Sequence, residues 1–111
     1  MAQTDILDAL MTQIQLRVAT LPEGSYTTKL LQAGTIKIGA KILEESLETV
    51  LAAQESGPEG KQHLIREACD VIYHLWVLLG SQGISVDDLR RELERREGVS
   101  GLEEKRRRGE G

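Results

Sequence analysis

The stretch that decides the fold covers residues 61–79 and reads KQHLIREACDVIYHLWVLL. Its larger apolar residues are distributed around most of a helical circumference, at Leu64, Ile65, Val71, Ile72, Leu75, Trp76, Leu78 and Leu79. A helix that is apolar nearly all round is expected to be buried on several sides. One polar stripe interrupts this surface, because residues spaced four, three and four apart share a helix face. The stripe consists of His63, Glu67, Asp70 and His74.

Four further helices are predicted, over residues 5–19, 25–34, 35–54 and 85–96. The first carries an apolar stripe made of Ile6, Leu7, Leu10, Ile14 and Val18. Thr4 and Ser25 are the expected N-caps of the first two helices, and Ser85 with Asp88 has the pattern of a capping box. The segment Ser56-Gly57-Pro58 is expected to end the third helix. Two long helices joined by a tight loop predict an antiparallel pair.

No strand-like alternation or internal repeat is visible in the sequence, so the predicted fold class is all-α. With 111 residues, the chain is long enough for one core but small enough to need a partner chain over part of its apolar surface. We therefore expect one all-α domain over residues 1–97 and a helical bundle that is completed by dimerisation. Residues 98–111 are expected to form a basic, mobile tail, because they contain few apolar anchors.

The charge distribution limits the classes of partner. The 18 acidic and 14 basic residues give a formal charge of -4, which argues against nucleic-acid binding through a basic surface. Eight of the basic residues lie between Arg90 and Arg108, so the C-terminal segment is cationic on an acidic body. The apolar run from Val71 to Leu79 is far shorter than the ~20 residues that span a bilayer. We expect no nucleic acid and no membrane as partners.

The cellular compartment is predicted from the cysteine content and the N-terminus. Cys69 is the only cysteine, so no intrachain disulfide is possible and a reducing compartment is the simplest assumption. Asp5 and Asp8 precede the first basic residue, Arg17, which is the wrong charge order for a secretory signal. A cytoplasmic location is therefore expected. Cys69 itself is expected to lie in the core, on the side of its helix away from Glu67 and Asp70.

Two acidic clusters stand inside the most apolar segments. Glu44, Glu45 and Glu48 fall within one quadrant of the third helix, beside an apolar arc. The arc consists of Ile36, Ala40, Leu43, Leu47, Val50 and Leu51. Like charges three and four residues apart repel, and burial adds to the free-energy cost, so this grouping together with Glu67 and Asp70 indicates a bound cation. Oxygen ligands favour Mg²⁺ first and Mn²⁺ as a substitute.

Five acids exceed what one magnesium ion needs, because Mg²⁺ usually takes one or two carboxylates together with substrate phosphates. Either two ions bind or one acid acts as a base, and both arrangements suit the hydrolysis of a phosphoanhydride. The alternatives are a solvated acidic face and a non-catalytic metal-binding or adaptor domain. A di-iron bundle is disfavoured, because no glutamate is followed by a histidine three residues later.

Several motifs together indicate a family. The pattern EExxE followed by ExxD matches Glu44, Glu45, Glu48, Glu67 and Asp70. The segments SYTTKLL at 25–31, DVIYH at 70–74 and GVSGLEEK at 98–105 match SYTxKLL, DLLYH and GxSGLEEK. On these residues the chain resembles the phosphoribosyl-ATP pyrophosphatases of histidine biosynthesis, within the all-α MazG-like NTP pyrophosphohydrolase superfamily. It departs from the family pattern at Leu43, where glycine is usual, and at Cys69, where alanine is usual.

The resemblance implies Mg²⁺-dependent hydrolysis of 1-(5-phosphoribosyl)-ATP to 1-(5-phosphoribosyl)-AMP and pyrophosphate by a homodimer. The runner-up activity is that of a housekeeping nucleoside triphosphate pyrophosphohydrolase. The expected catalytic residues are Glu44, Glu45 and Glu48, and the expected metal ligands are Glu45, Glu48, Glu67 and Asp70. The candidate substrate contacts are Lys37, Lys41, His74 and Lys105. His74 could equally be a hydrogen-bonded structural residue, Lys37 and Lys41 could merely balance the glutamates, and His63 is expected at the surface.

Overall fold

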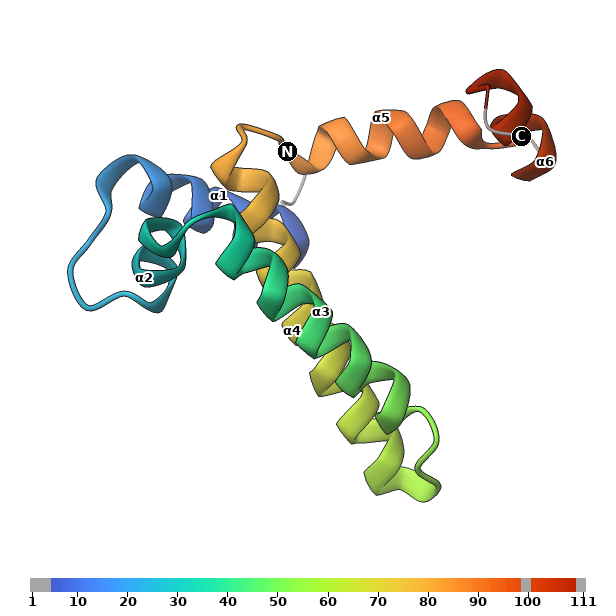
Figure 1. Cartoon of the computed structure of the whole chain (residues 1–111), viewed down its shortest axis with the longest axis horizontal. Helices are drawn as coiled ribbons and strands as arrows, with labels where there is room; N and C mark the ends of the chain where they lie inside the picture. The colour runs from blue at the N-terminus through green and yellow to red at the C-terminus, as the bar shows by residue number, and fades with distance from the viewer. Residues whose placement is uncertain (1–4, 99–100, 110–111) are drawn as a thin grey trace.

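The computed structural model describes residues 5–98 and 101–109, and within these it contains six α-helices and no strand (Figure 1). They are α1 (Ile6–Thr20), α2 (Tyr26–Ala33), α3 (Thr35–Ala52), α4 (Gly57–Ser81), α5 (Val86–Arg96) and α6 (Gly101–Arg107). The all-α class and the five longer predicted helices are confirmed. None of the described helices is both long and apolar enough to cross a bilayer.

The long helices α3 and α4 form the predicted antiparallel pair, which runs obliquely through the view of Figure 1. Helices α1 and α2 pack at the end of the pair where α3 begins and α4 ends. Helix α5 then leaves this end in a different direction and carries α6 at its far tip (Figure 1). The acidic stretches of α3 and α4 are therefore brought together by the pair itself.

The helix starts follow local capping chemistry. Ser25 and Ser85 cap α2 and α5 as predicted, and Asp88 completes the capping box with Ser85. Thr4 lies outside the described residues, and the cap of α1 is Asp5, whose carboxylate accepts a hydrogen bond from the Asp8 backbone N–H at 2.9 Å. Thr4 as the cap was therefore wrong.

Helix α4 begins at Gly57, four residues before the predicted start at Lys61. A proline in the interior of a helix breaks it, but one in the first turn does not, because the N–H groups there have no partner within the helix. Pro58 lies in the first turn of α4 and is therefore compatible with the earlier start. Gly60 packs against the preceding connection so closely that a Cβ would lie 2.9 Å from the Glu55 carbonyl carbon. The tight loop is therefore only the four residues 53–56.

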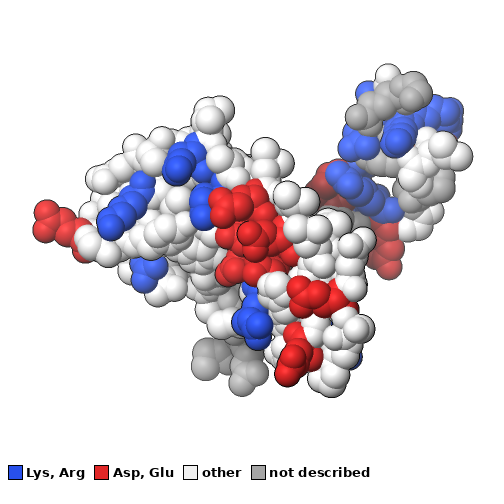
Figure 2. Space-filling model, turned by 60° about the horizontal axis from the view of Figure 1, so that its bottom comes forward, with Lys and Arg blue, Asp and Glu red and all other residues white. Residues whose placement is uncertain are grey.

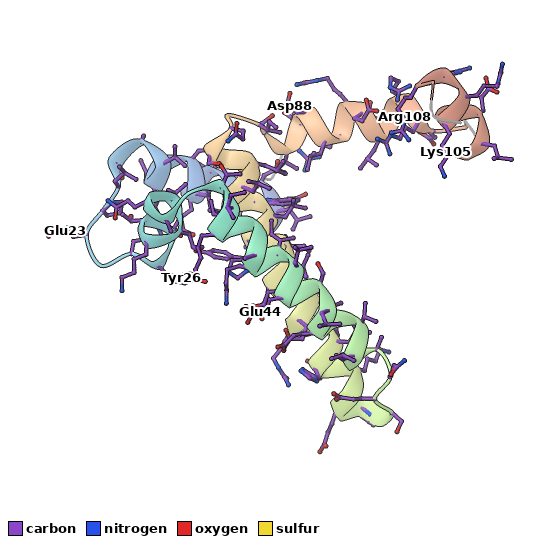
Figure 3. The ribbon with its side chains drawn as sticks, viewed as in Figure 1. Glu23, Tyr26, Glu44, Asp88, Lys105 and Arg108 are labelled. Carbon is purple, nitrogen blue, oxygen red and sulfur yellow. The ribbon has the colours of Figure 1, made fainter. Side chains whose placement is uncertain are left out.

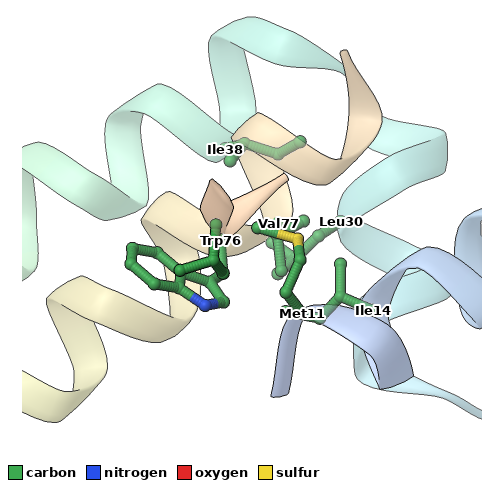
Figure 4. Close-up of a cluster of buried hydrophobic side chains, with 7 residues drawn as sticks. Met11, Ile14, Leu30, Ile38, Trp76 and Val77 are labelled. Atoms are coloured by element: carbon green, nitrogen blue, oxygen red, sulfur yellow. The ribbon is translucent and has the colours of Figure 1, made fainter. Parts of the chain in front are cut away.

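The core lies where α1, α2 and the C-terminal half of α4 meet the start of α3, and its buried side chains are shown in Figure 4. They are Met11, Ile14, Leu30, Ile38, Trp76, Val77 and Val86. The indole N–H of Trp76 donates to the Leu7 carbonyl at 3.0 Å, which ties α4 to α1. The apolar stripe predicted for α1 was partly wrong, because Ile6 and Leu7 are exposed and Met11 takes their place in the core.

Helix α3 exposes most of the apolar arc that the sequence predicted as its core side. Ile36 is 87% exposed and Leu43 is 73% exposed, and Leu47, Val50 and Leu51 are also exposed. The covered face of α3 is rotated from this arc and runs through Ile38, Ile42, Glu45, Thr49 and Ala52. Glu45 is thus inside the packed face and not at the margin of the core, whereas Glu44 and Glu48 are exposed.

Two further expectations meet the structure at the surface. Cys69 is exposed, so its predicted core position was wrong; α4 is covered on fewer sides within one chain than an all-round apolar helix suggested. In the expected tail, Gly101–Arg107 forms a helix, and residues 99–100 and 110–111 lie outside the described part. The mobility of the tail stays a prediction.

Candidate functional site

Three carboxylates from the central helix pair meet in one group. Glu45 projects from α3, and Glu67 and Asp70 project from neighbouring turns of α4. Each offers an oxygen atom, and these atoms all lie within 4.8 Å of one another. The side chains of Glu45 and Glu67 are each only 14% exposed, whereas Asp70 opens to solvent. Figure 2 shows acidic side chains gathered into one patch on this face of the molecule.

The electrostatics of this carboxylate group favour a bound cation. Partial burial and the neighbouring carboxylates of Glu67 and Asp70 raise the pKa of Glu45 above its usual value. The Oε2 atom of Glu67 is buried and has no hydrogen-bond partner among the described residues. A buried carboxylate oxygen without a partner carries a large desolvation cost, which a cation would offset. The donor set consists of oxygen alone, so the residues fit Mg²⁺ or Mn²⁺.

The two other glutamates of the EExxE pattern lie outside this group. Glu44 is exposed, and its carboxylate pairs with the Lys41 ammonium at 3.5 Å, while Lys41 also lies 4.0 Å from Glu45. The charge of Glu44 is the main reason why the pKa of Lys41 is raised. Glu48 is exposed one turn after Glu45. Of the four predicted metal ligands, the structure brings together Glu45, Glu67 and Asp70, and the role of Glu48 stays a prediction.

His63 joins the carboxylate group to the connection between α3 and α4. Its Nδ1 atom lies 2.9 Å from Glu55 Oε2, and its Nε2 atom lies 3.2 Å from Glu67 Oε1. When the ring is protonated, both nitrogens donate to carboxylates, and the hydrogen bond with Glu55 is the largest reason why the pKa of His63 is raised. The side chain is 34% exposed, so His63 lies at the surface as expected, but it is also tied there to two glutamates.

His74, at the other end of the polar stripe, serves the packing of α2 against α4. It is 5% exposed, and its Nδ1–H donates to the Asp70 carbonyl at 2.8 Å. That bond leaves Nε2 as an acceptor for the Tyr26 hydroxyl at 3.0 Å. The Tyr26 ring also stacks on Tyr73, with ring centroids 6.2 Å apart. Of the two interpretations of His74, these contacts favour the structural one.

A second polar link anchors the SYTTKLL segment beside the site. Thr27 is fully buried, and its hydroxyl is hydrogen-bonded to the Tyr73 hydroxyl and accepts from Arg17 at 3.2 Å. Tyr26, by contrast, is 48% exposed, although its hydroxyl is held by His74. In Figure 3, Tyr26 of α2 and Glu44 in the middle of α3 appear on the same side of the central helix pair. The sequence analysis predicted the helix that contains this segment but not these contacts with α1 and α4.

The remaining predicted substrate contacts lie apart from one another. Lys37 is exposed on α3, one turn before Lys41. Lys105 is exposed on α6, and Figure 3 shows it with Arg108 at the tip of the molecule, far from Glu44. Within one chain the described part of the basic tail, residues 98 and 101–109, therefore does not cover the carboxylate group. Arg106 and Arg107 of this helix pair locally with Glu103.

Comparison with known proteins finds a matching family model and several similar chains. The family model described as "Phosphoribosyl-ATP pyrophosphohydrolase" matches residues 7–97, which include the whole carboxylate group. The chain is 54% identical over 99 residues to a phosphoribosyl-ATP pyrophosphatase of Rhodopirellula baltica, covering 89% of this chain and 82% of that protein. It is 43% identical to proteins of the same name from Dechloromonas aromatica, over 98% of both chains, and from Metallosphaera sedula, over 84% of this chain and 97% of that protein.

Proposed function

The chain belongs to the phosphoribosyl-ATP pyrophosphohydrolase family, and from this premise we propose that it hydrolyses 1-(5-phosphoribosyl)-ATP to 1-(5-phosphoribosyl)-AMP and pyrophosphate in L-histidine biosynthesis. It is a hydrolase of a phosphoanhydride bond. The substrate assignment is supported by relatives that match nearly the whole chain. The chemistry is supported by one structural observation, the meeting of Glu45, Glu67 and Asp70 within 4.8 Å.

The proposed cofactor is Mg²⁺, with Mn²⁺ as a substitute, held by Glu45, Glu67 and Asp70 with Glu48 one turn away. When bound, a divalent ion would neutralise charge on the substrate phosphates and lower the pKa of the attacking water. The unpartnered Oε2 of Glu67 supports this assignment, because the atom is buried without a donor in the described part of the chain. The cellular location proposed for such an enzyme is the cytoplasm.

The exposed side chains of α3 around the EExxE pattern are proposed to accept a proton from the attacking water and to contact the substrate phosphates. Glu44 and Glu48 are open to solvent on either side of Glu45, so either can accept a proton from the attacking water. Lys41 neutralises Glu44 and Glu45, and Lys37 stands exposed one turn earlier, where it can contact phosphate oxygens. His74 contributes indirectly, because it holds the Tyr26 side chain beside this surface.

The active assembly is proposed to be a homodimer. Helix α3 exposes a continuous apolar face through Ile36, Leu43, Leu47, Val50 and Leu51. A helix face of this kind on a small domain is expected to be covered by another chain, and a two-fold pair is the simplest closed arrangement. A second chain that covers this face would also lie close to Glu44 and Glu48, which are on the same helix beside the apolar face.

A pyrophosphate-release assay tests the proposed reaction. With Mg²⁺ present, phosphoribosyl-ATP should turn over much faster than ATP or dUTP, and removal of the metal with EDTA should abolish the activity. Mn²⁺ should restore it. Equal or better turnover of ordinary nucleoside triphosphates would assign the chain to the housekeeping pyrophosphohydrolases. Repeating the assay on a chain that ends before Gly98 measures the contribution of the basic tail.

A further inference from the structure

The two oxygens of the Glu67 carboxylate have different surroundings. Oε1 lies 3.2 Å from His63 Nε2, whereas Oε2 is buried and has no hydrogen-bond partner in the described structure. His63 is in turn held from its other side, since Nδ1 lies 2.9 Å and 3.1 Å from the two oxygens of Glu55. The three side chains thus form a relay that starts outside the candidate metal site and ends on one of its ligands.

We propose that His63 is a positioning residue for this metal site: held by Glu55, it binds Oε1 of Glu67 and so orients Oε2 as the metal ligand. The inference rests on the proposed function, because it assumes that the carboxylate group binds a divalent cation. Carboxylates that ligate a metal are themselves held by hydrogen bonds from a surrounding layer of side chains. Without such a bond, the several rotatable bonds of a glutamate let its oxygens leave the ligand position.

The local fold is built to bring Glu55 and His63 together. Glu55 belongs to the short connection before α4, and His63 lies two turns inside this helix. The contact requires the connection to fold back against α4, and Gly60 makes room for that approach, because a Cβ there would lie 2.9 Å from Glu55 backbone atoms. The histidine ring is therefore fixed at two points, unlike an exposed ion pair formed only within one helix.

Three substitutions of His63 separate positioning from a simple loss of charge. In His63→Gln the amide nitrogen reaches about as far as Nε2, so it can donate to Glu67. In His63→Asn it reaches only about as far as Nδ1, so it can donate to Glu55 but not to Glu67. His63→Ala removes both contacts. All three variants lose the charge of the ring equally, so charge cannot explain a difference among them.

The measurement is Mn²⁺ binding to the nucleotide-free protein, followed by electron paramagnetic resonance. The affinity of the Gln variant for Mn²⁺ should be at least about tenfold higher than that of the Asn and Ala variants. This is the effect typical of losing a hydrogen bond to a metal ligand. Gln62→Ala, which changes an exposed neighbour, should bind like the wild type. Circular dichroism should show the same helicity in all variants. In the Mg²⁺ assay, the Asn variant should need more metal than the Gln variant to reach half of its maximal rate.

The outcomes separate this inference from the proposed function. If the wild type binds Mn²⁺ but the Gln and Asn variants bind it equally well, the positioning role is wrong and the metal site stands. If the wild type binds no Mn²⁺, the positioning role and the proposed metal site are both wrong. Glu55→Ala gives an independent check: it should weaken Mn²⁺ binding while leaving the His63 side chain in place, and unchanged binding would limit the relay to His63 and Glu67.

Discussion

Three carboxylates within 4.8 Å of one another repel in the absence of a metal, and each is a candidate ligand. We predict that Glu45→Gln, Glu67→Gln and Asp70→Asn each lower Mg²⁺-dependent turnover by roughly 100-fold, since each removes one ligand oxygen charge. The melting temperature of the metal-free protein should stay the same or rise, because one repulsion is relieved. Pyrophosphate release and thermal melting followed by circular dichroism measure the two effects.

The matched comparison is with the exposed glutamates of the same helix. Glu48→Gln should also lose activity if the predicted role of Glu48 holds, although this residue lies outside the three-carboxylate group. Glu44→Gln tests the proton-accepting role. Wild-type turnover in all of these variants would contradict the site assignment, whereas full activity of Glu48→Gln alone would remove only that residue from it.

At the level of residues, helical spacing predicted which acidic side chains share a face, whereas the apolar pattern did not predict which of them are buried. Glu67 and Asp70 share a face by their spacing alone, and the contact of His63 with Glu67 could have been found in the same way, because they are four residues apart. The contact of His63 with Glu55 could not, since it depends on α4 starting at Gly57 and on the close approach at Gly60. Glu45 was placed at the margin because the covered face of α3 is rotated from its apolar arc.

At the level of elements, one arginine ties α5 to the start of α1. The Arg90 guanidinium donates to Asp8 at 2.7 Å, to Asp5 at 3.3 Å and to Asp87 at 2.8 Å. We predict that Arg90→Gln raises amide hydrogen exchange in α5 and in the first turn of α1, without changing exchange in α3 and α4. Hydrogen–deuterium exchange with mass spectrometry measures this pattern.

Arg91→Gln is the control for this experiment. Arg91 pairs with Asp88 inside α5 and makes no ion pair with α1 in the described structure. Its loss should weaken α5 locally and leave the first turn of α1 protected. Equal exchange of α1 in both variants would mean that apolar contacts, such as those of Val86 in the core, hold α5 in place.

The ion pairs of α5 also predict how its stability depends on pH. Hydrogen bonds from Arg95 and Arg96 lower the pKa of Glu92 to about 2. A carboxyl group whose pKa is depressed in the folded state contributes stability above its unfolded value, here 4.5, and loses it as the pH falls towards about 2. The pKa values of Asp8 and Asp88 are lowered by their hydrogen bonds as well, chiefly to Arg90 and to the Ser85 backbone. Protection of α5 against hydrogen exchange should therefore fall through this acidic window.

Glu92→Gln provides the check on this pH dependence. The variant should show weaker protection of α5 at neutral pH and a smaller further loss on acidification, because its side chain no longer titrates. The side chains of Glu92, Arg95 and Arg96 are each 45–46% exposed, so added salt should reduce the difference between variant and wild type. A wild-type α5 whose protection is independent of pH between 4.5 and 2 would contradict the role of these pairs.

At the level of the whole molecule, the sequence predicted the class and the central helix pair but not the direction of α5. Helix patterning identifies each element and its apolar side. The direction of α5 depends on single contacts between distant residues, such as Arg90 with Asp8, which no periodicity reveals. For the same reason Lys105 of the basic tail was expected to contact the substrate, whereas Figure 3 shows Lys105 and Arg108 at the far tip of the molecule, well away from Glu44.

The exposed apolar face of α3 gives the prediction that concerns the assembly. These residues form the apolar arc that the sequence predicted as a core side. Within one chain no other helix of the described structure packs on this arc. We predict that the wild type sediments at twice the chain mass at micromolar concentration, with α3 of each chain at the two-fold interface. Leu43→Lys together with Leu47→Lys should shift the protein to monomers, because lysine ammonium groups would be buried without partners.

Leu93→Lys is the matched control, because Leu93 is 65% exposed on α5, which projects away from α3 (Figure 1). This variant should remain a dimer with wild-type activity. A dimeric double variant at α3 would move the interface elsewhere, for example to the groove on α1 lined by Ile6, Leu10 and Leu16. A wild type that sediments as a single, fully helical chain would contradict the dimer outright, and the apolar arc of α3 would then be a stable exposed surface of an unusual size.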